Sequence, residues 1–232
     1  MTLPVLISLP HGGLAVPPEV VPFHILTEKE IIEDGDEGAS EIYDIENEVD
    51  IFVSTKIARA FVDLNRAFDD MTQDGVVKTH TCWGVPVYKE KLPEEVVRIL
   101  LDRYYEPYHA NLEKLKSKAK LCLDCHTMAA FGPPVGPDHG QERPHVCLSN
   151  AGNTCSEELL RKVADLFKTS FGEKVSVNHP FRGGHIIKRH SGGTPWIQVE
   201  ISRAPFMSNA QKQSAFLKAI HALFSGGQKL PV

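Results

Sequence analysis

Short apolar runs alternate with segments of helical periodicity along the chain, and this alternation limits the possible folds more than any other feature. The runs Leu3–Leu9, Ile51–Ser54, Leu121–Cys125 and Trp196–Ile201 have the length and composition of buried strands. The segments between them carry apolar residues three or four positions apart, as on one face of a helix. Strands that alternate with helices are typical of layered α/β proteins, so the sequence predicts a β-sheet flanked by helices.

The predicted helices are recognised by this spacing and by capping residues at their starts. Thr27 and Glu30 match a capping box, and Ser156 precedes an amphipathic segment that runs to Phe171. Pro107 is expected to kink or divide the long helix predicted between Pro93 and Lys118. The remaining predictions are a weak helix at Ser40–Glu48, a last helix at Asn209–Phe224 ended by Gly226 and Gly227, and strands at Ala60–Leu64 and Val175–Asn178.

Composition and charge exclude several classes of function. The net charge of −5 and the absence of a basic patch argue against binding to nucleic acid. A P-loop and a Gly-x-Gly-x-x-Gly motif are both missing from the sequence, which argues against a nucleotide site. Because no run of about 18 apolar residues occurs, we expect no membrane span. We expect one domain over residues 1–232, since no linker divides the sequence, and its oligomeric state is left open.

The cysteines fit a reducing compartment. The N-terminal segment lacks the basic region of a signal peptide, so we predict a cytoplasmic location. The five cysteines are an odd number with irregular spacing, which argues against a disulfide framework. Cys122 and Cys125 resemble half of a zinc knuckle, but on a strand their side chains would face opposite ways. We therefore expect both to be buried thiols.

Polar residues collect at the carboxyl ends of the predicted strands. His11 follows the first strand, Asn65 and Arg66 follow the run at 60–64, His126 follows Leu121–Cys125, and Glu200 lies near the end of the last strand. In open α/β sheets, ligands bind beyond the carboxyl ends of the strands. The alternation of side chains along a strand also places Asp124 on the same face as His126. The sequence therefore predicts one polar site at this edge of the sheet.

Two histidines at such a site suggest a metal centre. Two imidazoles and one carboxylate, with an open fourth position, are the usual ligands of a hydrolytic zinc ion. Our choice for the carboxylate is Asp36, with Asp34 and Glu37 as alternatives. From the residues alone, the acidic turn at 33–38 is better explained as the start of a helix, where acidic side chains are favoured.

Two irregular segments could belong to the site. The stretch Phe131–Thr154 is rich in Gly, Pro and His and has no periodicity, which is typical of a functional loop. The glycine-rich stretch from Arg182 to Gly193 could be a substrate loop or only a turn before the last strand.

A set of short motifs, taken in order, resembles the N-formylglutamate amidohydrolase family over about residues 4–207. The motifs are Pro10-His11-Gly12-Gly13, Asp34-Gly35-Asp36, Val62-Asp63-Leu64-Asn65-Arg66, Tyr105-Glu106-Pro107-Tyr108-His109, Asp124-Cys125-His126-Thr127, Arg182-Gly183-Gly184-His185 and Gln198-Val199-Glu200. The resemblance implies a hydrolase fold like that of zinc carboxypeptidases, with a central mixed, mostly parallel sheet.

The resemblance also implies an activity and a set of site residues. The activity is zinc-dependent hydrolysis of a linear amide in a small N-acyl amino acid, most simply N-formylglutamate. In this interpretation the zinc ligands are His11, Asp36 and His126, the catalytic residues are Glu200 and Arg66, and the substrate-binding residues are Asn65, Arg182, Gly184, His185 and Arg203. The alternatives are a carboxypeptidase or deacylase with another substrate and a non-catalytic metal- or small-molecule-binding protein.

Overall fold

A mixed six-stranded sheet forms the centre of the protein. The computed structural model describes residues 2–134, 138–225 and 230. Within these residues the strand order is β2-β1-β3-β6-β4-β5. The strands are β1 (Leu3–Leu9), β2 (Val49–Ser54), β3 (Leu121–Met128), β4 (Val146–Ser149), β5 (Val175–Val177) and β6 (Trp196–Ser202). β1, β2, β3 and β6 run parallel, whereas β4 is antiparallel to β6 and parallel to β5. The predicted α/β class with a mixed, mostly parallel sheet is confirmed.

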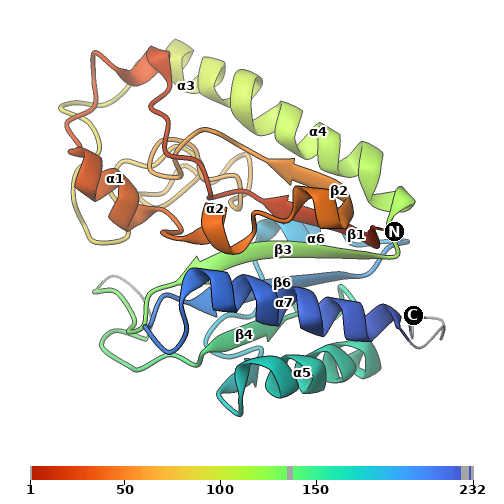
Figure 1. Cartoon of the computed structure of the whole chain (residues 1–232). Helices are drawn as coiled ribbons and strands as arrows, with labels where there is room; N and C mark the ends of the chain where they lie inside the picture. The colour runs from red at the N-terminus through yellow and green to blue at the C-terminus, as the bar shows by residue number, and fades with distance from the viewer. Residues whose placement is uncertain (1, 135–137, 226–229, 231–232) are drawn as a thin grey trace.

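Helices cover both faces of this sheet (Figure 1). One face packs against α2 (Ala39–Ile42), α5 (Glu157–Phe171) and α7 (Asn209–Phe224). The other face packs against a continuous helical segment and against α6 (His185–His190). That segment consists of α3 (Glu94–Leu100), the π-helical turn η3 (Leu101–Tyr105) and α4 (Glu106–Leu115). The remaining helical elements are α1 (Glu28–Asp34), η1 (Pro18–Val20), η2 (Glu46–Glu48) and η4 (Lys116–Lys118). Among the described residues, no helix combines the length and apolar character needed to cross a membrane.

The alternation of side chains along β3 divides the core into two clusters. Leu123 and Cys125 belong to the cluster beneath α5 and α7, whereas Cys122 belongs to the cluster beneath α3, α4 and α6. Cys122 and Cys125 are both buried free thiols on opposite faces, as predicted. The same alternation turns His126 toward the α4 side of the sheet, where the strand ends are polar.

Most helix boundaries agree with the capping residues. Thr27 forms a complete capping box at the start of α1, and the Ser156 side chain accepts a hydrogen bond from Leu159 at the start of α5. The segment around Pro107 is divided by a π-helical turn, and the chain stays helical throughout. The weak helix expected at 40–48 is instead α2 followed by the short turn η2. The predicted end of the last helix, Gly226 and Gly227, lies outside the described residues.

Three predictions of local structure were wrong. Ala60–Leu64 is not a strand, because this apolar run is buried as successive turns, in which the amide of Asp63 donates to the Val76 carbonyl. The stretch 131–154 is not wholly irregular, since it contains β4, which pairs with β6. The glycine-rich stretch from Arg182 to Gly193 contains α6, which begins directly after Gly184.

Candidate active site

Polar side chains in or just beyond β1, β3 and β6 meet in one cavity at the carboxyl ends of these strands. The cavity has a volume of about 340 Å³ and includes His11, His126 and Glu200 in its wall. His126 and Glu200 are direct neighbours in the register of β3 and β6. His11 lies two residues beyond the end of β1.

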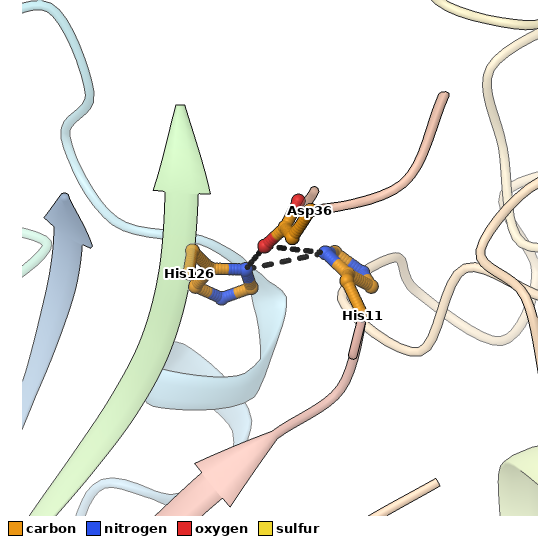
Figure 2. A group of neighbouring side chains, drawn as sticks. All are labelled: His11, Asp36 and His126. Carbon is orange, nitrogen blue, oxygen red and sulfur yellow. Dashed lines mark hydrogen bonds and ion pairs between the residues drawn. The ribbon is translucent and has the colours of Figure 1, made fainter. Parts of the chain in front are cut away.

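Three side chains from distant parts of the sequence converge at one point of this cavity (Figure 2). The Nδ1 atoms of His11 and His126 lie 3.2 Å apart. The Asp36 Oδ2 atom lies 3.0 Å from Nδ1 of His126 and 3.6 Å from Nδ1 of His11. All three residues are buried, with 2 to 6 % of each exposed. The structure thus brings together the three residues chosen from the sequence as metal ligands.

The Nε2 atom of each imidazole, on the side of the ring away from the converging donors, is hydrogen-bonded to a carboxylate. Nε2 of His11 lies 2.8 Å from Oδ1 of Asp63, and Nε2 of His126 lies 2.9 Å from Oδ2 of Asp124. An ionised carboxylate only accepts hydrogen bonds, so each Nε2 donates a proton, and each ring in its neutral form presents a lone pair at Nδ1. Such outer carboxylates orient histidine ligands and raise their basicity.

Sequence reasoning placed Asp124 on the same face as His126 but did not connect Asp63 with His11. The sequence does show an acidic residue in the polar segment 62–66. No sequence spacing, however, indicates that this segment lies beside His11. In the structure the Asp63 carboxylate also accepts from Nε of Arg59 at 3.0 Å and from the Asn65 amide at 2.9 Å. Burial alone would raise the pKa of Asp63. The charges of His11, Arg59 and Arg66 nevertheless hold this pKa well below its usual value.

The acidic turn at 33–38 places only one of its candidate carboxylates at this point. Oδ2 of Asp36 accepts from the Thr127 amide at 3.1 Å. Burial alone would raise the pKa of Asp36, but His11 and His126 lower it well below its usual value. Asp34 instead pairs with the buried ammonium of Lys78 at 3.1 Å, and Glu37 is exposed.

The donor set fits a divalent metal ion of the zinc type. Two nitrogen lone pairs and one carboxylate oxygen face the same point, an arrangement that repels itself unless a cation lies between the donors. A tetrahedral zinc ion with bonds of about 2.0–2.1 Å requires ligand atoms about 3.3–3.4 Å apart. The three observed separations, 3.0, 3.2 and 3.6 Å, scatter around that value. Asp124 and Glu200 also raise the pKa of His126 well above its usual value despite the opposing effect of burial, which marks the point as one that attracts positive charge.

Glu200 is a buried carboxylate beside this donor set. Its Oε1 accepts from Nε2 of Gln198 at 2.8 Å, and Oε1 of Gln198 accepts in turn from the Gly184 amide at 2.5 Å. Burial raises the pKa of Glu200, although the neighbouring His126 opposes the shift. A carboxylate of raised pKa in a cavity is well suited to accept a proton.

The other residues chosen from the sequence divide into two groups. Asn65, Arg66, Arg182, Gly184 and Arg203 lie in the wall of the same cavity. His185 does not belong to that wall, because its imidazole lies 3.1 Å from the hydroxyl of Tyr105 on the helical side.

Three of the cavity arginines are held by carboxylates. Arg59 pairs with Asp63, Arg66 with Asp74, and Arg143 with Asp138. By contrast, Arg182 makes no hydrogen bond within the described part of the chain. Arg203 donates from one Nη to the Gly35 carbonyl, and its buried Nε has no partner among the described residues. Arg182 and Arg203 therefore keep donors available in the cavity.

Gly184 is packed so closely that only glycine fits. A Cβ atom there would lie 2.2 Å from Nδ2 of Asn65. Asn65 cannot move freely, because its Oδ1 accepts from the Ile186 amide at 2.8 Å. We predict that Gly184→Ala lowers stability by about 1–3 kcal/mol, the usual range for overpacking. Thermal unfolding measures this change, and Gly35→Ala is the control, since a Cβ atom there meets its nearest neighbour at an ordinary 3.5 Å. Equal melting temperatures for both variants would contradict the prediction.

Comparison with known proteins identifies the family of this chain. The family model described as N-formylglutamate amidohydrolase matches residues 3–207. The chain belongs to this family. The matched region of the N-formylglutamate amidohydrolase family includes every residue of the site described above, so the resemblance noted in the sequence is confirmed.

Curated relatives and solved structures extend the comparison. N-formylglutamate deformylases of Pseudomonas putida and Pseudomonas aeruginosa are 24 % and 26 % identical, over 90 % and 88 % of this chain and 84 % and 82 % of theirs. The crystal structure of N-formylglutamate amidohydrolase from Ralstonia eutropha has a TM-score of 0.77 at 19 % identity, covering 96 % of this chain and 93 % of that one. A gene product of Agrobacterium tumefaciens has a TM-score of 0.73 at 15 % identity, covering 96 % and 88 %. These structures show the same fold.

Proposed function

We propose that this protein is a zinc-dependent amidohydrolase that cleaves N-formylglutamate to formate and glutamate. The observation that carries the proposal is the convergence of His11, Asp36 and His126 beside the buried Glu200 in one cavity. Membership of the N-formylglutamate amidohydrolase family and the deformylase names of two curated relatives support the same conclusion.

The metal would be held by the two Nδ1 atoms and the Asp36 carboxylate. When bound there, a zinc ion lowers the pKa of a water molecule toward about 7 and polarises a carbonyl group. The protein contributes the orientation of the donors, because Asp63 and Asp124 fix both imidazoles with Nδ1 toward the cavity.

Glu200 is the proposed general base and acid. It accepts a proton from the attacking water molecule while the new bond forms to the formyl carbon. The C–N bond then breaks, and Glu200 delivers the proton to the leaving amine of glutamate. Gln198 holds the carboxylate in place for both transfers, since it donates to Oε1 at 2.8 Å.

Arginines in the cavity are suited to binding an anionic substrate. Arg182 and Arg203, which keep free donors, are proposed to bind the two carboxylates of N-formylglutamate, with the bidentate geometry that guanidinium groups favour. Arg66 and Asn65 also line the cavity, and we propose that they stabilise the charge that develops on the formyl oxygen.

A substrate panel tests this proposal. We expect zinc-loaded protein to release formate from N-formyl-L-glutamate with a kcat/KM about 100-fold or more above that for N-formyl-L-methionine, because the apolar analogue leaves one cavity arginine without a carboxylate partner. N-acetyl-L-glutamate and a dipeptide ending in glutamate serve as controls for deacylase and carboxypeptidase activity. Preference for either control would replace the proposed substrate, and no turnover of any compound would support a binding protein.

A further inference from the structure

One motif of the sequence, Tyr105-Glu106-Pro107-Tyr108-His109, lies outside the cavity but faces the sheet. Tyr105, Tyr108 and His109 are buried, with 0, 6 and 0 % of each residue exposed. Their spacing puts them on one face of the helical segment, at the junction of η3 and α4. Burying three polar side chains is costly unless each has a hydrogen-bond partner, so their partners indicate what this face does.

Tyr108 is connected to the ligand imidazole of His126 by a chain of hydrogen bonds. Ser8 donates its hydroxyl proton to Oδ1 of Asp124 at 2.8 Å, so Tyr108 is the donor in its 2.9 Å hydrogen bond with Ser8. The other oxygen of Asp124 accepts from Nε2 of His126 at 2.9 Å. Burial raises the pKa of Tyr108, which keeps its hydroxyl protonated as this chain requires.

Tyr105 and His109 hold the loop that carries Asn65. The Tyr105 hydroxyl donates to the Arg66 carbonyl at 2.9 Å. Nε2 of His109 lies 3.0 Å from the Leu64 carbonyl, which can only accept. The two carbonyls on either side of Asn65 are therefore both bound to the same helical face.

The π-helical turn keeps this face continuous. Pro107 has no amide proton, so it cannot make the usual helical hydrogen bond. The wider turn from Leu101 to Tyr105 precedes it, and the Glu106 amide donates to the Leu101 carbonyl. π-helical turns of this kind occur frequently at functional sites.

We propose that Tyr105, Tyr108 and His109 are positioning residues of the active site. Tyr108 acts through Ser8 and Asp124 on the His126 imidazole, while Tyr105 and His109 set the position of Asn65 and Arg66. None of the three lies in the cavity wall. The inference rests on the proposed amide hydrolysis for its kinetic consequences, but its effect on His126 can be measured without substrate.

The first part of the proposal, the action of Tyr108 on His126 (the Tyr108 branch), is tested with Tyr108→Phe and Ser8→Ala. We expect each to weaken zinc affinity about 10-fold in competition with a chromophoric chelator, as for other groups outside the ligand set. The double variant should be no weaker than either single variant, because both break the same chain. Tyr104→Phe is the matched control, since Tyr104 donates to Glu19 on another side of the helix. Wild-type affinity in Tyr108→Phe, or additive losses, would overturn this branch.

A second readout needs neither metal nor turnover. Long-range ¹H–¹⁵N spectra, recorded at a pH where the imidazole is neutral, report which nitrogen of His126 carries a proton. We expect the Nε2–H form in wild type and in Tyr104→Phe, and a mixture of both forms in Tyr108→Phe. An unchanged spectrum in Tyr108→Phe would contradict the proposal even if the protein bound no zinc.

The second part of the proposal, the positioning of Asn65 and Arg66 by Tyr105 and His109, is tested by kinetics with N-formyl-L-glutamate. Tyr105→Phe and His109→Phe should lower kcat/KM about 10-fold without changing zinc affinity, and His109→Gln should recover most of this loss because it retains a donor near Nε2. If wild type cleaves N-formylglutamate and all variants match Tyr104→Phe, the positioning proposal fails and the function stands. If wild type does not cleave it, the proposed function fails, and the metal and spectral measurements still decide the Tyr108 branch.

Discussion

Glu200→Gln is expected to lower kcat by about 10³- to 10⁴-fold, since a general base that later acts as an acid contributes on that scale. The amide of glutamine has nearly the same shape as the carboxylate and can still accept from Gln198 at Oε1. It cannot accept the proton of water, so chemistry is lost while the cavity is kept. The measurement is formate release from N-formyl-L-glutamate under saturating substrate.

Metal content is the internal control for this variant. Glu200 is not one of the three converging donors, so Glu200→Gln should retain as much zinc as wild type. A loss of activity that accompanied a loss of zinc would assign Glu200 to metal binding. Full activity in the variant would remove Glu200 from the mechanism.

The second large effect is expected from His126→Ala, measured as metal content of protein purified without chelator. Wild type should contain about one zinc ion per chain, as a site with three protein ligands predicts, and the variant should contain none. Removing the imidazole also leaves Oδ2 of the buried Asp124 carboxylate without its hydrogen-bond donor, which is destabilising. His126→Gln is therefore measured in parallel, because its amide can still donate toward Asp124.

A graded variant separates binding from folding. Asp63→Asn keeps all three donors but weakens the hold on His11, so its zinc affinity should fall about 10- to 100-fold while the protein remains folded by circular dichroism. Absence of zinc from wild type, even after zinc is added back, would remove the proposed mechanism. The cavity would then be better explained as a metal-free binding site for an anionic molecule.

Sequence reasoning located the site because parallel strands carry their polar ends to one edge. His11 and His126 follow or end strands that are neighbours in the sheet, and Glu200 is in register with His126. Asp36 was chosen from three neighbouring acids without a geometric reason, and the structure brings this carboxylate to the two histidines. The Asp34 carboxylate instead forms an ion pair with Lys78, and no local sequence pattern indicates this pair.

What could not be predicted depends on packing between distant segments. The apolar run at 60–64 has strand composition, but its amides donate to the carbonyls of Ala58 and Val76 instead of to a neighbouring strand. The orientation of His185 toward Tyr105 depends on α6, a short helix hidden in a glycine-rich stretch. The hydrogen-bond chain from Tyr108 to His126 joins residues from three elements, and sequence spacing does not encode such a chain.

The central place of β6 has a consequence for biosynthesis. β6 is the last strand of the sheet in sequence, yet it joins β3 on one side to β4 on the other. A nascent chain that has not yet released residues 196–202 from the ribosome therefore has two partial sheets with open edges, which are prone to pair with other chains. Glu200 arrives with the same strand. The closure of the sheet and the completion of the proposed catalytic site therefore occur together, late in synthesis.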